Sequence, residues 1–401
     1  MILIVLLLLP LAMLISVPLT AWLISLGRKW GHLDEPGGDG SHKRHARPVP
    51  VTGGIGIFAT VMLPLAAALL AIHFVPVDSL PAFLAPMRDH AAGLRSQTAM
   101  GLAVVAAAAI FHVMGLIDDR RRLGPFSKLI VQIIVAATLA GAFDMRVLQL
   151  LDQHGPLGKA ASIAISVLWI VTITNAINFL DNMDGLSAGV SAIIAAIYLA
   201  ATLIGGQWFV AAMCALLLGA LIGFLIFNFP PARVFMGDAG ALVVGLLLAV
   251  ISIRTTYIAP GAGALGSGAA GMGALSPHAL GPHAAGETLG PGSAWYGVLM
   301  PLVVMAIPLY DIASVTLIRL SQGKSPFHPD QQHFSHRLVA RGLSRRAAVI
   351  VIWLCTLATG LGGVLLGRLE AWQAALVATQ SIAVVVMLAV MERSAGRANG
   401  E

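Results

Sequence analysis

The chain has 401 residues, of which 58% are hydrophobic and only 10% are charged. Soluble domains carry roughly a quarter charged residues, so this composition excludes a soluble globular protein and indicates a helical protein with many membrane crossings. The formal net charge of +6 has little meaning apart from where the charges fall, and we expect no nucleic-acid partner. The two cysteines, Cys214 and Cys355, lie in separate apolar runs and predict neither a disulfide framework nor a metal site.

Apolar runs recur along nearly the whole chain and predict eleven transmembrane helices, each near the roughly 20 residues that a bilayer requires. Met1 to Ile24 lacks a cationic start and a cleavage pattern, so we interpret it as an uncleaved first span. The predicted spans are 2–26, 53–75, 97–117, 126–143, 160–178, 186–204, 207–228, 238–258, 295–320, 346–366 and 370–391. The chain is therefore predicted to be an all-α polytopic membrane protein.

The distribution of Lys and Arg predicts its orientation. The loops after the odd-numbered spans, together with the C-terminal tail, hold 18 of these residues, and the other loops hold 6. Because positive charges concentrate in the cytoplasm, we expect the N-terminus outside and the C-terminus inside. Residues 1–392 then form one integral-membrane domain, 259–294 a flexible Gly/Ala-rich external loop, and 393–401 a cytoplasmic tail.

The first cytoplasmic loop carries a basic cluster, His42-Lys43-Arg44-His45-Ala-Arg47, followed by prolines and the pair Gly53-Gly54. Guanidinium and ammonium groups in a shaped loop suit phosphate oxygens. The alternative is a topology signal or a contact with anionic lipid.

The second loop begins with two adjacent acids, Asp118 and Asp119, directly after an apolar run. Adjacent residues are about 100° apart on a helix, so the two carboxylates cannot have the same role. One is expected to face a metal or a nucleophile while the other meets a cation. The alternative is a solvated, salt-bridged helix end.

The third loop is the densest polar stretch, with Asn175, Asn178, Asp181, Asn182 and Asp184 at the end of a membrane span. An Asp near a bilayer centre costs about 2.5–3.5 kcal/mol on insertion scales, so such a cluster belongs near the interface and has a use. If the helix continues, Asn175, Asn178 and Asp181 project from one face. This row suits a polar ligand that carries a metal ion, and a capped helix end is the simpler alternative.

The fourth loop places Phe235 shortly before Asp238, an acid flanked by glycines that can approach a metal or phosphate closely. Its position at the start of a helix is also typical of an N-cap.

The fifth loop contains His333 and His336, whose i, i+3 spacing predicts one shared helical face, and their rings could bind phosphate or a transition metal. Hard oxygen ligands dominate the other loops, so Mg²⁺, or Mn²⁺ as the alternative, fits better than zinc. Asp311, inside the ninth span, either partners a polar group or lines the site.

These five loops together resemble the polyprenyl-phosphate N-acetylhexosamine-1-phosphate transferase family, which includes the enzymes that begin O-antigen, enterobacterial common antigen and teichoic-acid linkage synthesis, and the phospho-MurNAc-pentapeptide translocase. The resemblance covers about residues 1 to 392, and 175–186 and 235–238 are its most specific motifs. It implies a Mg²⁺-dependent enzyme of the bacterial inner membrane, with homodimers in the family. A UDP-sugar would pass its sugar-1-phosphate to undecaprenyl phosphate and release UMP.

The resemblance also implies roles for single residues. Asp238 is similar to the family's metal-binding aspartate, and Asp118 and Asp119 to its paired acids, which activate the lipid phosphate or hold the metal-diphosphate. Asp184 and Phe235 resemble the groups that contact uracil. We therefore predict catalytic or metal-binding roles for Asp118, Asp119, Asp238, His333 and His336, and substrate contacts from Lys43, Arg44, His45, Asn175, Asn178, Asp181, Asp184, Asn228 and Phe235.

Two departures from the family pattern bear on the substrate. Ser335 stands where the histidine motif usually has a third histidine, and the central motif reads Asp-Asn-Met-Asp-Gly, with Asn182 where the translocase has glycine. The first loop also lacks the translocase's Thr-Pro-Thr-Met-Gly-Gly. We therefore favour a UDP-N-acetylhexosamine over UDP-MurNAc-pentapeptide, which stays as the alternative.

Two other classes compete with this prediction. Intramembrane acids and broken helices also mark secondary transporters, but their coupling residues lie near the bilayer midplane and their halves often repeat. Here the acids lie in cytoplasmic loops and no repeat is seen. A non-catalytic scaffold is the second competitor, and the intact carboxylates argue against it.

Overall fold

A computed structural model describes the chain over residues 1–31, 33–34, 48–76, 79, 81–121, 123–255, 295–325, 332–364, 366 and 369–393. The predicted external loop 259–294 and the tail from 394 onwards lie outside these residues. So do Lys43, Arg44 and His45, whose predicted contacts stay predictions.

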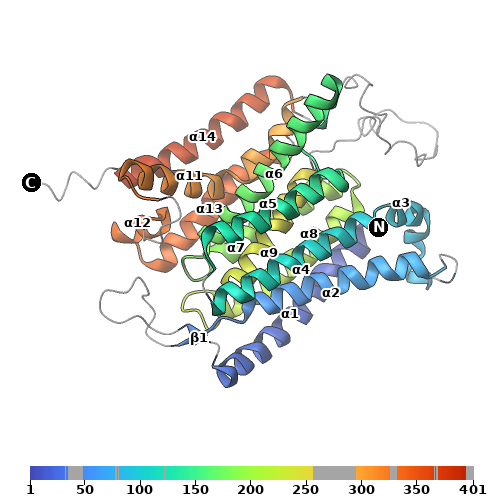
Figure 1. Ribbon diagram of the computed structural model, residues 1–401, viewed down its shortest axis with the longest axis horizontal. Helices are drawn as coiled ribbons and strands as arrows, with labels where there is room; N and C mark the ends of the chain where they lie inside the picture. Colours follow the sequence, from blue (N-terminus) through green and yellow to red (C-terminus); the bar gives the residue numbers. More distant parts are fainter. Residues whose placement is uncertain are drawn as a thin grey trace, which may run out of the picture.

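The described residues form a bundle of helices that run roughly side by side (Figure 1). The long helices are α1 (Ile2–Trp30), α2 (Gly53–Phe74), α4 (Thr98–Arg120), α5 (Pro125–Ala142), α6 (Gly155–Leu180), α7 (Leu186–Ile204), α8 (Trp208–Asn228), α9 (Gly237–Thr255), α11 (Ala306–Ser321), α13 (Arg345–Gly363) and α14 (Ala371–Arg393). The short ones are η2 (Ala82–His90), α3 (Ala91–Ser96), η3 (Gln149–His154), η7 (Trp295–Leu299), α10 (Met300–Val304) and α12 (Phe334–Ala340). Two short antiparallel strands, β1 (Leu33–Asp34) and β2 (Val49–Pro50), join α1 to α2.

The prediction of an all-α polytopic membrane protein is confirmed. Within the described residues, ten helices are long and apolar enough to cross a bilayer, and a bent pair of helices raises the number to eleven. The predicted ninth span, 295–320, is this pair, bent by 62° between α10 and α11. Pro308 explains the break, because a proline has no N–H and its ring clashes with the carbonyl four residues earlier, here that of Val304.

Helix α9 lies at the centre of the bundle. In the most apolar 18-residue stretch of α9, 83% of the residues are buried. The corresponding share is 17% in α1 and in α14, which lie on opposite sides of the bundle (Figure 1). A helix that is apolar all round must be enclosed by other helices, and α4 and α6 pack against α9. The start of α9 is thereby held by the surrounding structure.

Close backbone contacts fix the segment that leads into α9. The N–H groups of Gly53 and Gly54, at the start of α2, donate to the carbonyls of Phe235 and Met236, each at 3.0 Å. A Cβ at Gly115 of α4 would lie 2.4 Å from the backbone of Ala239, so only glycine permits this approach. Two helices, α2 and α4, therefore set the position of the residues around 238.

We predict that Gly54→Ala destabilises the protein. The added Cβ would lie 2.3 Å from the backbone nitrogen of Gly240 and 2.7 Å from the carbonyl oxygen of Met236. Overpacking of this kind costs about 1–3 kcal/mol, so the melting temperature in detergent should fall. Gly141→Ala on α5 is the matched control, since no atom lies within 4 Å of its new Cβ. Equal melting temperatures for the two variants would contradict the tight packing.

Candidate active site

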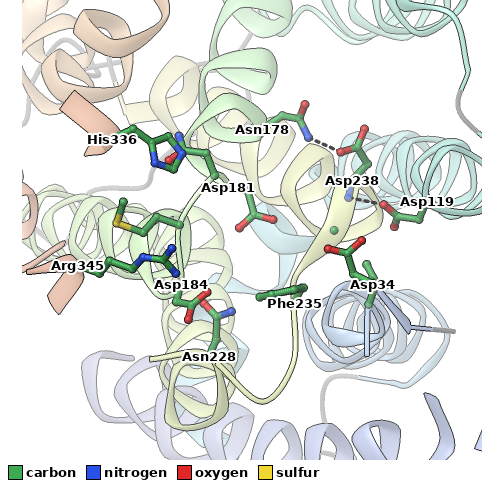
Figure 2. A pocket seen from close by; sticks show the side chains of 14 residues that line it. Asp34, Asp119, Asn178, Asp181, Asp184, Asn228, Phe235, Asp238, His336 and Arg345 are labelled. Atoms are coloured by element: carbon green, nitrogen blue, oxygen red, sulfur yellow. Dashed lines mark hydrogen bonds between the residues drawn. The ribbon is translucent and has the colours of Figure 1, made fainter. Parts of the chain in front are cut away.

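An open cavity of about 380 Å³ lies where several of the long helices begin or end. Figure 2 shows the side chains that line it. It is lined by residues at the ends of helices and in the connections that follow α1, α4, α6, α8 and α11, the five regions predicted to share one side of the membrane. The lining residues are Asp34, Val51, Asp119, Asn178, Asp181, Asn182, Met183, Asp184, Asn228, Phe235, Gly237, Asp238, His336 and Arg345. Eight of the predicted site residues thus meet in one cavity: Asp119, Asn178, Asp181, Asp184, Asn228, Phe235, Asp238 and His336.

Asp119 anchors the start of α9. Its Oδ1 accepts the backbone N–H of Asp238 at 2.9 Å, and its Oδ2 accepts that of Ala239 at 3.2 Å. The first N–H groups of a helix have no partner within the helix, and a carboxylate there also interacts favourably with the helix dipole. Gly237, just before them, has φ +67° and carries no Cβ that would meet the Asp119 carboxylate. Asp119, on α4, therefore caps the start of α9. This is the role that the sequence offered as the alternative for Asp238.

Lys128, at the start of α5, joins two of the acids. Its Nζ lies 2.9 Å from Oδ2 of Asp118 and 2.9 Å from Oδ2 of Asp238. Asp118 also accepts the backbone N–H of Leu123 at 2.6 Å, and it is not among the residues that line the cavity. The expectation that one of the paired acids meets a cation is therefore met by Asp118. Lys128 was missed at the sequence level, because a single lysine before an apolar run is typical of a topology signal.

Asn178 fixes the other oxygen of Asp238. Its Nδ2 donates to Oδ1 of Asp238 at 2.9 Å (Figure 2). Asn175, one turn earlier on α6, donates instead to Oε1 of Gln132 at 2.6 Å and does not line the cavity. Helix α6 ends at Leu180, so Asp181 follows its last turn and the predicted helical row stops before it.

Asp184 and Asn228 hold the loops around the cavity together. Oδ2 of Asp184 accepts the backbone N–H of Ala232 at 2.9 Å. Oδ1 of Asn228 accepts the N–H of Gly185 at 3.0 Å, and its Nδ2 donates to the carbonyl of Val234 at 2.8 Å. The α6–α7 turn and the α8–α9 loop are thus fastened to each other, and Phe235 is presented at the cavity wall.

The two predicted histidines separate, and the prediction that they share a helical face is wrong. Helix α12 begins at Phe334, and His333 precedes it as an extended N-cap residue. The Nδ1 of His333 lies 2.9 Å from Oδ2 of Asp311, which is fully buried and also accepts the N–H of Phe334 at 3.1 Å. Asp311 is therefore the structural partner that the sequence left as one of two alternatives. Only His336 reaches the cavity.

Negative charge dominates one side of the cavity. Figure 2 shows Asp34, Asp119 and Asp238 on one side, His336 and Arg345 on the other, and Asp181 between them. Desolvation, followed by repulsion from Asp238 and Asp119, raises the pKa of Asp181 from 3.8 to about 8. Asp34 and Arg345 were not among the predicted site residues, because charges near a helix end are also typical of solvated surfaces and have no distinctive spacing here.

The donor set suits a hard divalent cation, although no ready-made cage is seen. Among the described residues, no three His, Cys, Asp or Glu side chains are arranged to hold one ion. Carboxylate and amide oxygens are the ligands that Mg²⁺ prefers, and it usually takes only one or two carboxylates together with substrate phosphates. Asp181 and Asp238 line the cavity together, and the pKa of Asp181 is raised first by burial and then by repulsion from Asp238 and Asp119, a repulsion that a bound cation would relieve.

Comparisons with known proteins show which family the sequence resembles. The profile of glycosyl transferase family 4 matches residues 101–256, a range that spans α4 to α9. A Bacillus subtilis (strain 168) protein named as a probable undecaprenyl-phosphate N-acetylglucosaminyl 1-phosphate transferase is 28% identical over 86% of this chain and 80% of its own length.

Two further relatives have different names and cover different shares of this chain. A Mycobacterium leprae (strain TN) decaprenyl-phosphate N-acetylglucosaminephosphotransferase is 31% identical over 77% of this chain and 71% of its own length. A phospho-N-acetylmuramoyl-pentapeptide-transferase of Desulforudis audaxviator (strain MP104C) is 31% identical over 51% of this chain and 62% of its own length. The extent of these matches, and the position of the profile over the cavity-forming helices, show that the chain belongs to glycosyl transferase family 4.

Proposed function

We propose that the protein transfers N-acetylglucosamine-1-phosphate from UDP-N-acetylglucosamine to undecaprenyl phosphate and thereby starts a cell-surface polysaccharide. An oxygen of the lipid phosphate would attack the sugar-linked phosphorus of the UDP-sugar. The new P–O bond forms as the bond to the UMP phosphate breaks, and UMP leaves. The observation that carries the proposal is the cavity at the helix ends, where five carboxylates gather and one of them, Asp238, is bound by Lys128.

The cavity supplies what phosphoryl transfer needs most, namely alignment and neutralisation of charge. The ammonium of Lys128 lies 2.9 Å from Asp238, which lines the cavity, and would attract a phosphate oxygen bound beside this carboxylate. His336 and Arg345 line the opposite side, where a second anionic group of the donor would fit. The lipid phosphate is already largely ionised near pH 7, so no strong general base is required.

A Mg²⁺ ion, with Mn²⁺ as the alternative, would be held by Asp238 and Asp181, and would neutralise charge on the diphosphate. The predicted ligands Asp118 and Asp119 have other partners: Asp118 accepts from Lys128 and Leu123, and Asp119 accepts from the start of α9. Their hydrogen bonds favour an anchoring role, and their metal ligation stays a prediction.

The alternative donor is UDP-MurNAc-pentapeptide, because some relatives are named after N-acetylglucosamine and others after N-acetylmuramoyl-pentapeptide. The relative named as a pentapeptide-transferase is similar over a smaller part of the chain than those named after N-acetylglucosamine. Transport is disfavoured because the acids gather at the helix ends rather than at mid-depth. The bacterial inner membrane, the cytoplasmic position of the cavity and a homodimer stay predictions.

The first test is the exchange of labelled UMP into UDP-N-acetylglucosamine by purified protein with undecaprenyl phosphate and Mg²⁺. We expect Asp238→Asn, which keeps the shape and removes the charge, to lower the rate by about 100-fold or more. Asp144→Asn is the control, since Asp144 pairs with Arg146 outside the cavity. Wild-type exchange by Asp238→Asn would refute the role given to this carboxylate.

Lys128→Met is expected to lower kcat/KM by about 100-fold, because it removes the cation between Asp118 and Asp238 and a partner for phosphate. Lys159 is the matched control, because it lies near the start of α6, roughly 28 Å along the helix from Asn178. Lys159→Met should therefore keep wild-type kinetics. A similar loss in both variants would indicate a general effect of removing positive charge.

The raised pKa of Asp181 predicts a pH-dependent stability for metal-free protein. The folded state holds a proton between about pH 4 and 8 that the unfolded state releases, so this contribution to stability is lost as pH rises through that window. In EDTA, the melting temperature of wild type should fall more steeply between pH 6 and 8 than that of Asp181→Asn. Parallel curves would show that the pKa of Asp181 is not raised in the folded protein, and added Mg²⁺ should flatten the wild-type curve.

A further inference from the structure

The two departures from the family pattern, Asn182 and Ser335, contact each other. They are 153 positions apart in the sequence, and the hydroxyl of Ser335 donates a hydrogen bond to Oδ1 of Asn182 at 2.7 Å. Neither local spacing nor composition links the α6–α7 turn with α12. The contact indicates that the two residues serve one purpose.

Asn182 lines the cavity, yet both of its polar atoms bind protein. Its Oδ1 accepts from Ser335, and its Nδ2 donates to the carbonyl of Phe179 at 2.6 Å. Phe179 lies in the last turn of α6, and its ring meets the edge of the His333 ring at a centroid distance of 5.7 Å. The amide therefore bridges the end of α6 and the start of α12.

The start of α12 is anchored at consecutive residues. Asp311 holds the ring of His333 and the backbone N–H of Phe334, and Asn182 holds the fully buried side chain of Ser335. The next residue is His336, which lines the cavity. The two anchors therefore fix the backbone from which the His336 side chain projects.

We propose that Asn182 and Ser335 are a matched pair of positioning residues that set His336 at the cavity, and that a histidine at position 335 requires glycine at position 182. Ser335 has no exposed surface, so an imidazole in its place needs new space. The side chain next to its hydroxyl is the Asn182 amide, and glycine would vacate that volume. Conversely, glycine at 182 alone would leave the buried Ser335 hydroxyl and the Phe179 carbonyl without these partners.

A double-mutant cycle with Asn182→Ala and Ser335→Ala tests the pair. Each single variant should lower kcat by about tenfold with KM for the UDP-sugar within about twofold, and the double variant should be no worse than the poorer single one. Ser16→Ala is the matched control, because Ser16 is equally buried but donates to Ala220 on α8. Its effect should multiply with that of Asn182→Ala. Multiplying effects of Asn182→Ala and Ser335→Ala would overturn the pairing.

The size argument has its own test. Ser335→His should lower both kcat and the melting temperature, and Asn182→Gly in the same chain should restore at least about threefold in kcat and part of the melting temperature. If Ser335→His yields no folded protein, a folded double variant still supports the proposal. A double variant no better than Ser335→His overturns it.

The kcat measurements depend on the proposed transferase activity, whereas the melting temperatures do not. If wild type exchanges no UMP with any UDP-sugar, the proposed function fails, and the same cycle in melting temperature decides the pairing. Coupled melting temperatures would then support the Asn182–Ser335 pair without the activity. Additive ones would overturn it.

Discussion

The site depends on the hydrogen bonds between the Asp119 carboxylate and the first turn of α9. Helix α9 is enclosed on all sides, so its first N–H groups need partners from the protein, and Asp119 satisfies those of Asp238 and Ala239. Glycine at 237 allows the turn, and glycines at 54 and 115 let α2 and α4 approach. The place of Asp238 is therefore set by backbone geometry rather than by its own side chain.

From this anchor the charges of the cavity follow. Asp238 receives Lys128 on one oxygen and Asn178 on the other, so α5 and α6 are oriented by the same residue that α4 holds in place. Burial of Asp181, together with repulsion from Asp238 and Asp119, raises its pKa to about 8. Such crowding costs stability in the free protein, and it is acceptable where a cation and anionic substrates are to be bound.

Much of the architecture could be predicted from the sequence, because a bilayer demands apolar helices of a certain length and because Lys and Arg are concentrated in alternate loops. The meeting of five loops at one end follows from that alternation. The break before Pro308 could also have been predicted from the proline alone, had the ninth run not been taken as continuous. What local spacing could not provide was the partner of each polar group. Lys128, for example, pairs with Asp238 across 110 positions.

The histidine motif illustrates the same limit at the level of a single turn. An i, i+3 spacing places two residues on one face only if the helix includes both, and here it begins between them. His333 then has a buried partner, while His336 faces the cavity. The acids divide in the same way: backbone and lysine donors occupy Asp118 and Asp119, and His333 occupies Asp311. Asp181 and Asp238 face the cavity, and the oxygens of Asp238 accept from the side chains of Lys128 and Asn178. Identical side chains at similar helix ends thus take different structural places, according to the donors that other parts of the chain bring to them.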